Sequence, residues 1–178
     1  MTSQRIIDLL NTSKGRIPIS LQGQVAKGGE KRIFEALDVH LDRTVALALP
    51  SDDATPGDLE RFLAEGRLTA RLNHPNIMPV HMMGILEEGS LPFFSMKLIH
   101  GDTLEQVIQR LREANKSYSN DYPLERLLAI FDRICDAISY AHANEVLHLD
   151  LKPANIRIGK FGEVIVCDWG SARTMRQG

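Results

Sequence analysis

The sequence has few of the features that staple a small protein together or anchor it in a membrane. Its 178 residues include two cysteines, Cys135 and Cys167, and neither has a cysteine or histidine neighbour at metal-ligand spacing, which excludes a zinc site and a disulfide-built secreted domain. No apolar run reaches the roughly 18 residues that a membrane-spanning helix needs. Residues 1–10 lack the cleavage site of a signal peptide. We therefore expect a cytoplasmic protein without a membrane partner.

The sequence also has no large excess of positive or negative charge. Lys and Arg number 21 and Asp and Glu number 23, so the formal net charge is −2. Because no basic cluster is interleaved with aromatic residues, the sequence predicts no nucleic-acid partner. A chain of this length with 43% hydrophobic residues can bury roughly 70% of its unfolded surface, so it is large enough to form its own core.

The hydrophobic pattern divides the sequence near residues 56 and 100. Apolar and polar residues alternate in the first part, which favours strands. After Pro56 the apolar residues have helical spacing, and Asp58 is the expected N-cap. The pattern predicts three antiparallel strands within 21–49, a helix from 56 that stops at 73–76, and two strands at 77–85 and 92–99.

Beyond residue 100 the pattern is helical. It predicts a helix at 103–114, a polar loop at 115–122 and a long helix at 124–142 that begins at Pro123. The apolar stripe of the long helix is wide enough to need neighbours on more than one side. We therefore expect self-association or a protein partner through residues 124–142.

The residues that suggest chemistry flank a hairpin predicted from 156–158 and 164–166. The segment His-Leu-Asp-Leu-Lys-Pro-Ala-Asn precedes the hairpin, and Asp168 follows it. Such a turn places Asp168 beside Asn155 and close to Asp150. Two carboxylates and an amide are hard oxygen ligands that suit Mg²⁺. With the positive charge of Lys152 they favour phosphoryl transfer.

At these residues the chain resembles a bacterial Ser/Thr protein kinase of the eukaryotic-like (Hanks) type, over about 21–173. Residues 148–155 are similar to the H-R-D-L-x-x-x-N loop, and Asp168-Trp169-Gly170 is similar to D-F-G. The resemblance implies an α+β fold and the cofactors ATP and Mg²⁺. It divides the chain into an N-terminal extension (1–20), a small antiparallel-sheet lobe with helix C (21–99) and an incomplete helical large lobe (100–178).

The resemblance also implies a role for each matching residue. Asp150 would accept the proton of the substrate hydroxyl and Lys152 would steady the transferred phosphoryl group. Asn155 and Asp168 would hold Mg²⁺. Glu65 matches the helix-C glutamate that pairs with the ATP-binding lysine. The implied nucleotide contacts are Val25, Gly28, Gly29, Ile33, Ala46 and the hinge residues Met96, Lys97 and Ile99.

Several positions depart from the family pattern. Ala48 occupies the place of the phosphate-binding lysine in V-A-I-K, and Leu149 replaces the arginine of H-R-D. Arg157 lies where the family has an apolar residue under adenine, and a charge there is costly unless it turns to water. Ala26, Gly28 and Lys31 occupy the three glycine positions of the Gly-rich loop.

Lys31 raises a specific alternative. In the with-no-lysine kinases a lysine at the third glycine position replaces the missing lysine, and Lys31 is at the corresponding position here. The other interpretation is a solvated lysine at a turn.

Two functions follow. We favour a pseudokinase or a catalytically impaired ATP-site module, because of Ala48, because of Arg157 and because the sequence ends at Gly178, before the A-P-E motif. The alternative is an active ATP-dependent Ser/Thr phosphotransferase that uses Lys31. Whether this chain is a short protein or a piece of a longer one, and whether it is an enzyme by itself, stays open.

Overall fold

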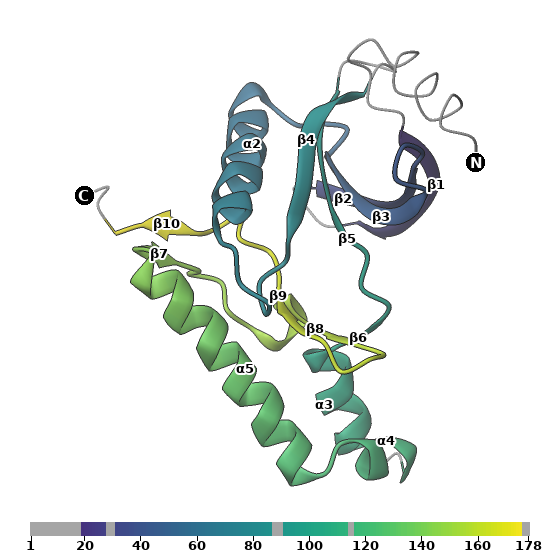
Figure 1. Ribbon diagram of the computed structural model, residues 1–178, viewed down its shortest axis with the longest axis vertical. Coiled ribbons are helices and arrows are strands. Elements are labelled where there is room, and N and C mark those ends of the chain that lie inside the picture. The colour runs from purple at the N-terminus through teal and green to yellow at the C-terminus, as the bar shows by residue number, and fades with distance from the viewer. Residues whose placement is uncertain (1–18, 28–30, 87–90, 114–115, 176–178) are drawn as a thin grey trace. The chain divides into compact units, whose positions relative to one another are not determined.

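The computed structural model describes residues 19–27, 31–86, 91–113 and 116–175 (Figure 1). They form two compact units that we describe separately. The sheet unit contains residues 19–63 and 80–98. The helical unit contains residues 64–79 and 99–175. The predicted glycines Gly28 and Gly29 lie outside the described residues.

The sheet unit is built on five antiparallel strands in the order β1-β2-β3-β5-β4. Its central strand β3 is buried on both faces. Val45, Leu47 and Leu49 pack on one face with Phe93, and Ala48 packs on the other. The predicted strands are confirmed, and their bounds are β1 Ile19–Lys27, β2 Lys31–Asp38, β3 Arg43–Pro50, β4 Val80–Leu86 and β5 Leu91–Lys97.

Helix α2 (Pro56–Arg71) begins one residue after Thr55. The Asp58 carboxylate accepts a hydrogen bond from the Thr55 backbone N–H (2.8 Å), and the Thr55 hydroxyl accepts one from the Asp58 backbone N–H (3.3 Å). This reciprocal arrangement caps the helix through Thr55, so the prediction of Asp58 as N-cap is wrong. The hydrogen bonds from Thr55 favour the charged carboxylate and lower the pKa of Asp58 below its ordinary value.

Among the described residues, the helical unit combines the C-terminal part of α2 and three further helices with two small sheets (Figure 1). The polar loop predicted over 115–122 is wrong, because residues 116–121 form a short helix. Tyr118 of that helix hydrogen-bonds Asp102 and stacks on Tyr122 at 5.6 Å. The elements are β6 Gly101–Thr103, α3 Leu104–Arg112, α4 Lys116–Asp121, α5 Leu124–Ala143, β7 Val146–Leu147, the 3₁₀ turn η1 Pro153–Asn155, β8 Ile156–Gly159, β9 Val164–Val166 and β10 Arg173–Thr174.

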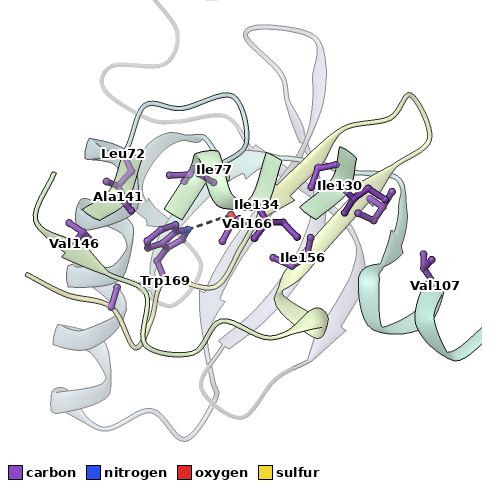
Figure 2. Packing of buried hydrophobic residues seen from close by; sticks show 14 residues of the cluster. Leu72, Ile77, Val107, Ile130, Ile134, Ala141, Val146, Ile156, Val166 and Trp169 are labelled. Atoms are coloured by element: carbon purple, nitrogen blue, oxygen red, sulfur yellow. Dashed lines mark hydrogen bonds between the residues drawn. The ribbon is translucent and has the colours of Figure 1, made fainter. Parts of the chain in front are cut away.

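The core of the helical unit centres on Trp169, which is 1% exposed (Figure 2). Its indole N–H donates to the Val166 carbonyl at 3.4 Å. Ile77 adds to the edge of β9 through a parallel bridge to Val166. The predicted hairpin is confirmed as β8–β9. Helix α5 covers this core with four buried residues: Ile130, Ile134, Ala137 and Ala141.

A second side of α5 is exposed in the part of the chain that the structure describes. Leu124, Leu128 and Phe131 are 66%, 57% and 64% exposed. Self-association or a protein partner through this helix stays a prediction. Among the described residues, no helix combines the length and the apolar character needed to cross a membrane.

Candidate active site

The loop between β7 and η1 brings together three of the predicted site residues. The Asp150 carboxylate accepts hydrogen bonds from Lys152 Nζ (2.8 Å) and Asn155 Nδ2 (3.1 Å). Asn155 Nδ2 also donates to the Asp150 backbone carbonyl at 2.9 Å. Asn155 is buried, whereas the side chains of Asp150 and Lys152 are 37% and 52% exposed. The loop therefore holds an exposed carboxylate in a fixed position.

This geometry keeps the Asp150 carboxylate charged. The hydrogen bond from Lys152 is the main cause that lowers the pKa of Asp150, and the Asn155 hydrogen bond acts in the same direction. The same contact raises the pKa of Lys152. At neutral pH the two residues form an ion pair, so Asp150 can accept a hydrogen bond or a proton from a hydroxyl.

A change of Lys152 to methionine is expected to raise the pKa of Asp150 toward its ordinary value. The folded pKa of Asp150 is lowered, so the hydrogen bonds to its carboxylate stabilise the fold at any pH above the unfolded pKa. This stabilisation is lost as the pH falls through the folded pKa. NMR titration of the Asp150 carboxyl carbon measures the shift. Lys160→Met, an exposed lysine on the hairpin, should leave the midpoint unchanged. If the Lys152→Met variant had the same Asp150 titration midpoint as the unmodified chain, Lys152 would not be the main cause of the lowered pKa.

Hydrogen bonds of the His148 ring and of the backbone join this loop to the segment after β9. His148 is buried, its Nδ1 accepts from the Asp150 backbone N–H (3.3 Å), and its Nε2 contacts the Cys167 carbonyl (3.0 Å). With Nδ1 accepting, Nε2 carries the proton and donates. The Cys167 N–H donates to the Asn155 carbonyl at 2.8 Å. The hairpin thus returns the chain to Asn155 one residue before Asp168.

Two residues at this junction adopt left-handed backbone conformations. Leu149 has φ 61° and Asp168 has φ 63°. Such a conformation is uncommon for residues other than glycine and costs about 1–3 kcal/mol where it is strained. It is seldom kept without a structural or functional reason. Leu149 directly precedes Asp150, and Asp168 is itself a predicted Mg²⁺ ligand.

The carboxylates of Glu65 and Asp168 converge on Gly170. A Cβ placed on Gly170 would lie 3.2 Å from Glu65 Oε2 and 3.7 Å from Asp168 Oδ1. Both side chains therefore face the position of Gly170, where a larger residue would crowd them. The sequence did not lead us to expect that Gly170 leaves room for the side chains of Glu65 and Asp168. The glycine of the D-F-G-like triplet was the available signal. The prediction for Glu65 named only its pairing with a lysine.

The donor atoms at this junction fit Mg²⁺ better than a transition metal. Asn155 and Asp168 offer an amide and a carboxylate, which are hard oxygen donors. Within the described ranges no group of three or more His, Cys, Asp or Glu side chains could hold a metal ion. Mg²⁺ commonly takes one or two carboxylates and completes its shell with water and substrate phosphate. Asn155 and Asp168 would hold the ion, which would neutralise phosphate charge.

In the sheet unit, strand register places several predicted nucleotide contacts on one face. Ile33 lies opposite Ala48, and Ala46 lies opposite Met96. Residues directly opposite in an antiparallel pair share a face, and alternate residues of one strand do so too. Three other contacts lie elsewhere: Val25 at a bulge of β1 with 51% exposure, Lys97 on the opposite face beside Val45, and Ile99, buried in the helical unit.

Lys31 shares the face of Ala48. Lys31 pairs with Pro50, and the next pair on the same face is Ile33 with Ala48. Diagonal neighbours on one face are roughly 7–8 Å apart, within reach of a long side chain. The register is therefore compatible with a lysine that extends over the position of Ala48.

Arg157 has partners that sequence analysis missed. Its guanidinium donates to the backbone carbonyls of Ile99 (2.9 Å) and Gly101 (3.0 Å). The charge is therefore balanced by backbone dipoles, as well as by the water that its partial exposure allows. The partners lie more than fifty positions earlier in the sequence, so no local pattern could have indicated them.

Comparison with known proteins identifies the family. The sequence model of the family described as "Protein kinase domain" matches residues 20–178 of this chain. This chain belongs to the protein kinase domain family. The kinase-like α+β fold and the kinship to Ser/Thr protein kinases are thereby confirmed.

The curated relatives of this kinase-family chain include serine/threonine-protein kinases PknD. The PknD of Protochlamydia amoebophila is 37% identical over 159 residues, which are 86% of this chain and 16% of the relative. The PknD of Chlamydia trachomatis serovar D is 36% identical and that of Chlamydia muridarum 35%, each over 153 residues, 83% of this chain and 16% of the relative. The chain thus spans about one sixth of the length of these relatives.

Proposed function

We propose that this chain is a nucleotide-binding module of the Ser/Thr protein kinase type that binds ATP with Mg²⁺ and is impaired in phosphoryl transfer. The observation that carries the proposal is the environment of Ala48. Its side chain is fully buried in an apolar cluster with Phe62 and Phe94, whose ring centroids lie 4.8 Å apart. A methyl group cannot donate a hydrogen bond to a phosphate, so the position of the family lysine has become part of the core.

Nucleotide binding is supported by the groups that remain. Asp150, Lys152 and Asn155 form one hydrogen-bonded cluster. The carboxylates of Glu65 and Asp168 both lie within 4 Å of the position that a Cβ on Gly170 would take, and carboxylates are hard oxygen donors that suit Mg²⁺. These residues can bind and orient a phosphate group and its cation even where transfer is slow.

Arg157 supports the impairment. Its guanidinium engages the Ile99 carbonyl, a backbone group of the hinge segment that the resemblance assigns to adenine. A carbonyl that already accepts a charge-assisted hydrogen bond is a weaker acceptor for a ligand. We therefore expect weaker adenine binding than in a kinase with an apolar residue at this position.

The second candidate is an active Ser/Thr phosphotransferase that uses Lys31. Lys31 shares a face with Ala48 through the β2–β3 register, and this supports the alternative. Asp150 would then accept the proton of the substrate hydroxyl as the hydroxyl oxygen bonds to the γ-phosphorus of ATP, the bond from that phosphorus to the bridging oxygen breaks, and ADP leaves.

Transfer of labelled γ-phosphate to a generic basic protein distinguishes the two candidates. The proposal predicts that the unmodified chain transfers no more label than Asp150→Asn, the blank that lacks the proton acceptor. Transfer above this blank that is lost in Lys31→Met and kept in Lys160→Met would contradict the impairment and support the second candidate. Lys160→Met controls for the loss of one lysine charge.

A further inference from the structure

A cavity of about 440 Å³ opens in the helical unit between α5 and the β8–β9 hairpin. Its lining includes the apolar residues Ala129 and Ile130 of α5 and Ile158 and Val164 of the hairpin. Its volume is in the range of ligand pockets. None of its lining residues belongs to the candidate active site. The remaining lining residues are Arg126, Arg133, Phe161, Gly162 and Glu163.

Two arginines give the cavity a positive rim. Arg126 and Arg133 are seven residues apart on α5, which is about two turns and roughly 10 Å along the helix axis. Glu163 supplies one negative charge against these two positive ones. The lining is therefore apolar with a net positive charge.

Backbone contacts hold both guanidinium groups in place. Arg133 Nη1 donates to the Gly162 carbonyl in the hairpin turn, and Arg126 Nη1 donates to the Asp121 carbonyl at 2.7 Å. The Arg126 guanidinium also lies 4.4 Å from the ring centre of Tyr122. Each guanidinium carries five N–H donors, so a fixed arginine can still donate a forked pair of hydrogen bonds to a carboxylate.

Phe161 adds an exposed aromatic ring at the edge of the cavity. It is 95% exposed at the turn of the hairpin. An aromatic side chain gains free energy when a partner covers it, and aromatic residues are enriched at binding surfaces.

We propose that this cavity is a docking site for an extended acidic segment of a partner protein. An apolar side chain of the segment occupies the floor formed by Ile130, Ile158 and Val164, and acidic side chains on either side pair with the two arginines. An extended chain rises roughly 3.3 Å per residue, so carboxylates about three residues apart match the spacing of the arginines. A single small carboxylate cannot span that distance. The proposal is independent of nucleotide binding.

Fluorescence anisotropy with labelled peptides tests the docking site on the 178-residue chain. The probe is a fluorescein-labelled nine-residue peptide with Glu-Leu-Leu-Glu at its centre and glycine and serine elsewhere. The expected result is saturable binding that weakens with added salt. Replacing both glutamates of the probe by glutamine, or both leucines by serine, should weaken binding at least about tenfold.

Variants of the chain locate the binding. Arg126→Ala combined with Arg133→Ala should weaken binding of the acidic probe at least about tenfold. The matched control combines Arg71→Ala with Arg112→Ala, which removes the same charge from exposed positions outside the cavity, and should leave affinity unchanged. Phe161→Ala should weaken binding about threefold. Because its side chain is almost fully exposed, this variant keeps the test valid even where the double arginine variant fails to fold.

Three results would overturn the proposal: no binding of the acidic probe at millimolar chain, equal binding of the glutamine probe, or an equal loss of affinity in the Arg71 and Arg112 control. Arg126→Glu combined with Arg133→Glu gives a further test. It should reverse the preference, so that a probe with lysine at both glutamate positions binds more tightly than the acidic one.

Discussion

Replacing Trp169 by alanine is expected to lower the free energy of unfolding of the helical unit by about 3–5 kcal/mol. The side chain is 1% exposed and packs among the residues of the β8–β9 hairpin, α5 and residue 77. Its removal leaves a cavity that neighbours on three separate segments cannot fill without shifting. The Val166 carbonyl also loses the indole N–H that donates to it.

The structural change caused by Trp169→Ala should extend to the candidate active site. The His148 ring lies 4.5 Å from the Trp169 ring, and His148 Nε2 donates to the Cys167 carbonyl next to Asp168. Without the indole, His148 loses the surface that positions its ring. We therefore expect the Asp150 and Asp168 backbone amides to shift in NMR spectra of the variant.

Urea unfolding followed by circular dichroism measures the effect, because Trp169 is the only tryptophan and the variant has no indole fluorescence. Phe161→Ala is the matched aromatic control. With 95% of its side chain exposed, it should change stability by less than about 0.5 kcal/mol. A Trp169→Ala variant as stable as the control would contradict the assignment of this residue to the core.

Gly101→Ala is expected to destabilise the helical unit by about 3 kcal/mol. Gly101 has φ 155°, and a Cβ at this position would lie 2.0 Å from the Ile158 carbonyl oxygen and 3.0 Å from the Gly159 Cα. Both obstacles are backbone atoms of β8, the strand that pairs with Gly101. The β6–β8 pair must therefore separate, which also moves the Gly101 carbonyl away from Arg157.

Gly162→Ala is the control that separates the two causes of destabilisation in Gly101→Ala, which are the clash of the added Cβ and the positive φ. Gly162 has φ 84°, and a Cβ added to it would meet no heavy atom of the described residues within 4 Å, so its substitution costs only conformational strain of about 1 kcal/mol. Thermal unfolding of both variants measures the difference. Equal losses of stability would show that the close approach of β6 and β8 does not limit the residue at 101.

Much of the fold was predictable because its elements are long and periodic. The five strands of the sheet unit and helix α5 each carry a clear alternation or a helical stripe, and the turn of the hairpin is bounded by Gly159 and Gly162. The strands β6, β7 and β10 have two or three residues, too few for a period to be visible. Helix α4 is polar, and contacts of Tyr118 with Asp102 and Tyr122 accompany its helical form.

The candidate site divides in the same way. Asp150, Lys152 and Asn155 meet within one loop of the sequence, so their proximity could be predicted from local spacing. The convergence of Glu65 with Asp168 at Gly170 and the bonds of Arg157 to Ile99 join distant segments. Only the folded chain reveals such contacts, because they depend on how separate elements pack.

Thermal unfolding of the chain with ATP and Mg²⁺ tests the central claim most directly. A ligand at 100 times its Kd stabilises the folded state by about 2.7 kcal/mol, so the melting temperature should rise with nucleotide concentration. Asp168→Asn, which suits the left-handed backbone at this position, should remove most of the shift. Asp136→Asn, an exposed residue of α5, should keep it. An unchanged melting temperature at millimolar ATP and Mg²⁺, or an equal shift in Asp168→Asn, would contradict a nucleotide site at these residues.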